Sequence, residues 1–144
     1  MFEVFELLRI IHTFFSCVRW VRLLSVGSSG EPSFERSIHS LFNIRPNTFD
    51  PTLKPNQKAM LSPFTSSMDF HEIGIGALGV GRGGKGGAKM GLDVIMAMLN
   101  HTYVDILKID CEGCETSAFE GMEKLDVFRG GRALFGVICV EIHQ

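Results

Sequence analysis

The chain has 144 residues, the usual size of a single domain, so we expect one hydrophobic core. Hydrophobic residues make up 45% of the chain and charged residues 21%, a balance typical of globular rather than disordered proteins. The formal net charge is −2, from 14 basic and 16 acidic residues, so no overall positive field is available to attract a phosphate backbone. We therefore expect no nucleic-acid partner.

Residues 1–20 are predicted to form an amphipathic helix. Its apolar residues follow helical spacing: Val4, Leu7, Leu8, Ile11, Phe15 and Val18. Interspersed charges leave no uncharged run near the roughly 20 residues that a membrane span needs, so no transmembrane segment is expected. Glu3 and Glu6 are also atypical of a signal peptide. Covering the core is the favoured role, and lying on a membrane surface is the alternative.

Residues 21–144 alternate short apolar runs with helical patterns. Strands are predicted at residues 22–26, 47–50, 68–75, 104–109 and 133–142, and helices at 34–42, 92–99 and 117–125. Ser33 is the expected N-cap of the first of these helices, and the segment from Pro55 to Pro63 is a loop or a helix. This alternation predicts an α/β fold with a Rossmann-like, doubly wound, mostly parallel sheet of about five strands in the order 3-2-1-4-5.

Two apparent nucleotide-binding motifs overlap the glycine-rich segment at residues 76–91. Gly74–Gly79 matches GxGxxG, but more glycine follows where that motif requires a helix. Gly79–Lys85 matches GxxxxGK, but Gly86 replaces the Ser or Thr that would bind Mg²⁺. We interpret the segment as a flexible surface insertion. A nucleotide oxidoreductase that uses Gly74–Gly79 remains an alternative, and it requires a helix directly after Gly79.

The four cysteines are Cys17, Cys111, Cys114 and Cys139. Their low density is unlike that of a disulfide-stapled secreted scaffold, so we expect them to be reduced, which favours the cytoplasm without determining the compartment. Cys111 and Cys114 form a lone CxxC with no second ligand pair, so no metal site is expected. A packed turn of small residues is favoured over a redox motif.

Several residues with functional chemistry directly follow predicted strands. Ligands of open α/β sheets bind outside the carboxyl ends of the strands, at the point where the strand order reverses. A tight turn at Gly27–Gly30 allows backbone N–H groups to approach a ligand. Asp50, twenty residues after Gly30, can accept hydrogen bonds from ribose hydroxyls. The alternative is that these are ordinary turn residues.

The most specific block of the sequence is VDILKIDCEGCE at residues 104–115. LKIDCEGCE resembles the signature of the FkbM-like methyltransferases, and it is closer still to a related eukaryotic methyltransferase-like family that has CEGCE. Four other blocks resemble the glycine motif, acidic strand end, third strand and fifth strand of that family, in the same order. They are SVGSSGEPSFE at residues 25–35, FDPT at 49–52, FHEIGIG at 70–76 and VEIH at 140–143.

The resemblance implies S-adenosylmethionine as cofactor and methyl transfer, with an oxygen of an unknown acceptor as the expected target. Carried over by position, Gly27, Ser28 and Gly30 would pass near the methionine part, and Asp50 would hold the ribose. Ile75 and Gly76 would lie near the adenine.

Asp110 and Glu112 would line the site of methyl transfer. On a continuing strand they would share a face, so one could hold the cofactor's amino group or a metal while the other acts as a base. His143, whose unperturbed pKa lies near neutrality, is a further candidate base, and Glu141 would share its face. Capping of the following helix is the alternative for Asp110 and Glu112, and an exposed chain end is the alternative for His143.

The predicted sheet departs from the usual seven strands of this methyltransferase class, because the sequence stops at Gln144, directly after the fifth strand. The sixth and seventh strands are expected to be absent. An apolar fifth strand at a sheet edge invites pairing with another chain. A fragment, a subunit that assembles through this edge, and an inactive copy are therefore alternatives to an active methyltransferase.

Overall fold

A computed structural model of the chain describes residues 21–77, 79–82, 87–125 and 134–141. The predicted helix at residues 1–20, Lys85 and His143 lie outside these residues. The described elements are β1 (Leu23–Val26), α2 (Ser33–Phe42), β2 (Asn47–Phe49), α3 (Pro55–Leu61), the 3-10 helix η1 (Ser62–Phe64), β3 (Asp69–His71), β4 (Gly74–Ile75), β5 (Val80–Arg82), β6 (Ala88–Met90), α4 (Leu92–Met98), β7 (Val104–Ile109), α5 (Glu115–Lys124) and β8 (Phe135–Val140). Within the described part, no helix is long and apolar enough to cross a membrane.

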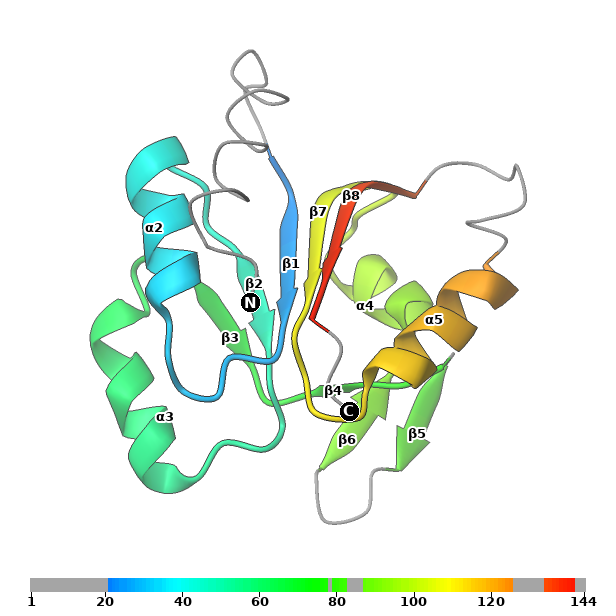
Figure 1. Ribbon diagram of the computed structural model, residues 1–144, viewed down its shortest axis with the longest axis horizontal. Coiled ribbons are helices and arrows are strands. Elements are labelled where there is room, and N and C mark those ends of the chain that lie inside the picture. The colour runs from blue at the N-terminus through cyan, green and yellow to red at the C-terminus, as the bar shows by residue number, and fades with distance from the viewer. Residues whose placement is uncertain (1–20, 78, 83–86, 126–133, 142–144) are drawn as a thin grey trace.

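The main sheet has five strands in the order β3-β2-β1-β7-β8, and every neighbouring pair is parallel (Figure 1). This confirms the Rossmann-like α/β fold and the predicted order 3-2-1-4-5, with β7 and β8 as the fourth and fifth strands. The register pairs Ser25 of β1 with Lys108 of β7, and Lys108 with Cys139 of β8. Ser25, Lys108 and Cys139 therefore lie in one row across β1, β7 and β8.

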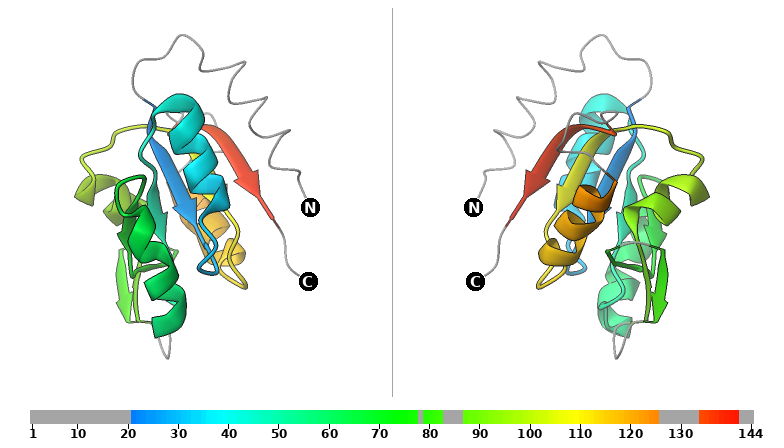
Figure 2. Two further views of the ribbon diagram at one scale, coloured as in Figure 1. Left: turned by 90° about the vertical axis from the view of Figure 1, so that its left-hand side faces the viewer. Right: turned by 90° about the vertical axis from the view of Figure 1, so that its right-hand side faces the viewer.

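Helices cover both faces of this sheet, as Figure 2 shows from its two sides. On one face, Leu23 and Ile106 pack with Phe34 and Ile38 of α2. On the other, Leu24 belongs to the larger core that includes residues of α4 and α5. The alternation of side chains along each strand explains this division, because neighbouring residues of β1 point to opposite faces. The sheet is thus doubly wound.

The helices begin and end close to their predicted limits. Asn43 ends α2 in the left-handed conformation, with φ of 53°. The predicted cap at Ser33 is wrong, because Pro32 is the N-cap and Ser33 is already the first helical residue. The last helix begins at Glu115, two residues before its predicted start at residue 117, because the turn that precedes it ends at Cys114.

The predicted third strand at residues 68–75 is wrong as a single element. Only Asp69–His71 joins the main sheet, whereas Gly74–Ile75 turns away into a second sheet of order β4-β6-β5. Ile75 of β4 is buried in the large core, together with residues of β1 and β7. Part of the predicted flexible insertion is therefore ordered sheet. Since β5 begins at Val80, no helix follows Gly79 and the GxGxxG interpretation is excluded.

Candidate functional site

The candidate site lies at the carboxyl ends of β1 and β7, where the strand order reverses. The turn after β1 and the turn after β7 touch at this point. Gly27 has φ of +84°, and a Cβ added to it would lie 1.8 Å from the carbonyl oxygen of Asp110. Only glycine allows this approach. Gly27 is therefore explained first by packing between two turns of the chain itself.

The backbone N–H groups of the turn after β1 already have partners within the chain. The N–H of Gly27 donates to the Phe49 carbonyl at 2.9 Å, and that of Glu31 donates to the Ser28 carbonyl at 2.8 Å. The N–H of Gly30 donates to the Ser28 hydroxyl at 3.4 Å. Asp50 accepts hydrogen bonds from the N–H groups of Ser28 and Ser29. Since the N–H groups of this turn all donate within the chain, the turn is unlike an anion-binding loop, whose N–H groups point to the ligand. That these groups approach a ligand stays a prediction, and it requires some of these hydrogen bonds within the chain to be exchanged.

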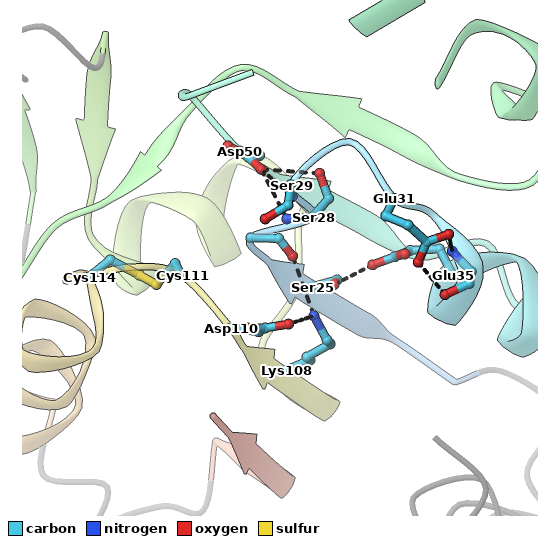
Figure 3. Close-up of polar contacts among 12 residues, drawn as sticks. Ser25, Ser28, Ser29, Glu31, Glu35, Asp50, Lys108, Asp110, Cys111 and Cys114 are labelled. Atoms are coloured by element: carbon cyan, nitrogen blue, oxygen red, sulfur yellow. Dashed lines mark hydrogen bonds and ion pairs between the residues drawn. A yellow bond between two sulfur atoms is a disulfide. The ribbon is translucent and has the colours of Figure 1, made fainter. Parts of the chain in front are cut away.

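Asp50 organises the same turn (Figure 3). Its Oδ2 accepts hydrogen bonds from the Ser28 N–H, the Ser28 hydroxyl and the Ser29 N–H at 3.0, 3.1 and 3.1 Å. Its Oδ1 accepts from the N–H and hydroxyl of Thr52 at 2.9 and 2.7 Å. Burial alone would raise the pKa of Asp50, but these hydrogen bonds outweigh it and lower the pKa. A role in holding ribose stays a prediction. It requires Asp50 to release one hydrogen-bond donor of the chain and to accept a hydrogen bond from a ribose hydroxyl instead.

Asp110 binds an ammonium group in this structure, that of Lys108. The Lys108 Nζ lies 2.9 Å from Asp110 Oδ2 and 3.4 Å from the carbonyl oxygen of Gly27 (Figure 3). The Lys108 side chain is 16% exposed and that of Asp110 is 34% exposed. The pair thus joins the two turns at the border between the protein interior and solvent.

A buried carboxyl group lies below the first turn and was not among the site residues predicted from sequence. Glu35 of α2 is 1% exposed and accepts a hydrogen bond from the Ser25 hydroxyl at 2.6 Å. Burial raises the pKa of Glu35, although the Ser25 hydroxyl and the charge of Lys108 oppose this effect. The sequence signal was a serine inside an apolar strand and a glutamate on the apolar side of the next helix.

Cys111 and Cys114 form a disulfide across the turn after β7, with their Cα atoms 5.6 Å apart. The prediction that they are reduced is wrong in this structure, because the turn brings them within the usual disulfide range. Cys139 has a free thiol. Because β7 ends at Ile109, Asp110 and Glu112 do not share the face of a continuing strand. Glu112 is exposed within the turn, and the N-cap of α5 is Cys114, not Asp110 or Glu112.

Glu115, the first residue of α5, carries an unexplained polar atom. The residue is 8% exposed, and its Oε1 has no hydrogen-bond partner among the described residues. It shares the buried stripe of α5 with Ala118 and Met122, so its side chain lies on the side of the helix that faces the sheet. An unpaired buried carboxylate oxygen is costly, which makes Glu115 a candidate for contact with a hydrogen-bond donor of a ligand.

Of the two residues expected near adenine, Ile75 lies inside the fold and Gly76 is half-buried. Ile75 is 1% exposed and belongs to the large core. The N–H of Gly76 donates to the Met90 carbonyl at 2.8 Å, and Ala77 packs closely against Gly121 of α5. Glu141 is exposed directly after β8. An adenine site at Ile75 and Gly76 stays a prediction, and the base predicted at His143 lies outside the described residues.

No group of His, Cys, Asp and Glu side chains suited to a metal ion occurs among the described residues. Comparison of the chain with protein-family models, with curated proteins and with solved structures found no match.

Proposed function

We propose that the protein binds S-adenosylmethionine at the junction of β1 and β7 and transfers its methyl group to an oxygen of an unidentified acceptor. The observation that carries this proposal is the contact between the turn after β1 and the LKIDCEGCE turn after β7, at Gly27 and Asp110. That contact brings the LKIDCEGCE block, the most specific part of the resemblance, against the block that resembles the family's glycine motif. It lies at the place where open α/β sheets bind their ligands.

The polar groups of the two turns fit part of this cofactor. The Asp110 carboxylate and the Gly27 carbonyl form a pair of acceptors suited to an ammonium group, as their contacts with Lys108 demonstrate. The unpaired Oε1 of Glu115 offers a third acceptor, suited to an amine or hydroxyl donor. The ribose part fits less well, because both oxygens of Asp50 accept hydrogen bonds from the chain.

When bound, S-adenosylmethionine supplies a methyl group on a sulfonium that is already activated, so positioning carries most of the catalysis. In the proposed reaction Asp110 orients the amino-acid part of the cofactor. Glu112 is the candidate base for the acceptor hydroxyl, because it is exposed in the same turn, two residues after Asp110.

Isothermal titration calorimetry of the full chain with S-adenosylmethionine tests the proposal. We expect saturable binding that Asp110→Asn and Glu115→Gln each weaken about tenfold, the loss of one charge-assisted hydrogen bond. Glu120→Gln is the matched control, because Glu120 is exposed on the same helix. An absence of binding by the folded wild-type protein at millimolar cofactor would refute the proposal.

A non-catalytic assembly module is the second candidate. The observation that favours it is the position of β8, which forms an edge of the main sheet with the apolar sequence FGVICV. An exposed apolar edge strand is a template for pairing with another chain. This candidate predicts a stable oligomer in size-exclusion chromatography with light scattering and no methyl transfer, whereas a monodisperse monomer argues against it.

A further inference from the structure

Lys108 occupies the acceptors that a ligand ammonium would need. Its Nζ contacts Asp110 Oδ2 at 2.9 Å and the Gly27 carbonyl oxygen at 3.4 Å, and it lies 5.6 Å from the centre of the Phe34 ring. Figure 3 shows the ammonium between the two turns, on the same side of the sheet as Ser25 and Glu35. An amino group of a ligand cannot take up this position while Lys108 remains there.

The pairing also affects the charge of the site. An ammonium 2.9 Å from a carboxylate neutralises it, so Asp110 attracts a second cation weakly until Lys108 withdraws. Lys108 has a second acidic neighbour on its other side. Glu35 is 1% exposed and binds Ser25, the register partner of Lys108. Burial raises the pKa of Glu35, and the nearby charge of Lys108 opposes that effect. A displaced Lys108 therefore stays near a second acidic side chain.

We propose that Lys108 is a specificity-determining residue that competes with the ligand's ammonium group for Asp110 and the Gly27 carbonyl. The inference rests on the proposed function and names a further property of the same site. A ligand that carries an ammonium group must displace the Lys108 ammonium, whereas the affinity of a ligand without one does not depend on Lys108. Lys108 thereby lowers the affinity for S-adenosylmethionine while it holds the two turns together in the absence of ligand.

The test uses calorimetry of the full chain with S-adenosylmethionine and with 5′-methylthioadenosine, which keeps the adenosine and sulfur but lacks the amino-acid part. Lys108→Met is expected to bind S-adenosylmethionine about tenfold more tightly, because one charge-assisted hydrogen bond no longer has to be broken. Its affinity for 5′-methylthioadenosine is expected to be unchanged. Lys124→Met is the matched control, because Lys124 is exposed on α5, and it should alter neither affinity.

Unchanged or weaker binding of S-adenosylmethionine by folded Lys108→Met overturns the inference, as does an equal gain for both ligands. Nitrogen-15 NMR of the Lys108 ammonium in the wild-type protein gives a reading that does not depend on the variant's folding. The signal should shift with S-adenosylmethionine and not with 5′-methylthioadenosine, and equal shifts overturn the inference. If the wild-type protein and the variant bind neither ligand, the proposed function itself fails and this inference fails with it.

Discussion

Gly27 and Gly113 form a matched pair for testing how the two turns of the candidate site meet. Their φ angles are +84° and +83°, so alanine is equally strained in the backbone at both positions. An added Cβ at Gly27 would lie 1.8 Å from the Asp110 carbonyl oxygen, whereas none of the described atoms lies within 4 Å of one at Gly113. The two substitutions therefore differ chiefly in the steric contact between the turns.

Left-handed backbone costs an alanine about 1–2 kcal/mol, which is the whole effect expected for Gly113→Ala. At Gly27 the obstructing atom belongs to the backbone and cannot rotate away, which adds about 2–3 kcal/mol of overpacking. Gly27→Ala should thus lower the free energy of unfolding by about 3–5 kcal/mol. At about 3 °C per kcal/mol, calorimetric melting should fall by about 10–15 °C for Gly27→Ala and about 3–6 °C for Gly113→Ala. Equal melting temperatures for the two variants would refute the close approach of the turns.

Three further predictions concern the buried acids and the disulfide. Asp50→Asn should lower stability by about 2 kcal/mol in urea unfolding at pH 7, with exposed Asp69→Asn as control. Because the pKa of Asp50 is lowered from 3.8, its contribution to the free energy of unfolding is present above that pH and is lost as the pH falls through the lowered pKa. In that range the free energies of unfolding of the variant and the wild-type protein should converge. The pKa of Glu35 is raised from 4.5, so its ionisation opposes folding above that pH. Glu35→Gln should therefore be more stable than the wild-type protein at pH 7, but not below pH 4.5. A higher free energy of unfolding for the variant below pH 4.5 would contradict this. Reduction of the Cys111–Cys114 disulfide by a phosphine should lower the free energy of unfolding by about 2 kcal/mol, the value expected for so short a loop. The loss should occur in the wild-type protein and in Cys139→Ser, but not in Cys111→Ser. An intact mass that shows both thiols free before reduction would exclude the bond.

The apolar runs of the sequence were sufficient to predict most of the main sheet. A buried parallel strand such as Val104–Ile109 is apolar on both faces, and the stripe formed by Phe34 and Ile38 recurs at helical spacing. The strand Gly74–Ile75 was misassigned because local pattern does not reveal where a chain leaves one sheet for another. The position of this strand depends on contacts with residues far away in the sequence, those of the core in which Ile75 is buried.

The sequence by itself determined the fold class, the strand order and the two turns at which the candidate residues lie, because hydrophobic periodicity and turn chemistry are local properties. The tertiary structure decided the partners. It directs Asp50 to the Ser28 turn, Lys108 to Asp110, and Glu35 into the interior beside Ser25. The contacts of Asp50 and Glu35 join residues from separate elements, and Lys108 also reaches the Gly27 carbonyl in the turn after β1. Geometry and burial therefore had to be known before the carboxylates at these turns could be told apart.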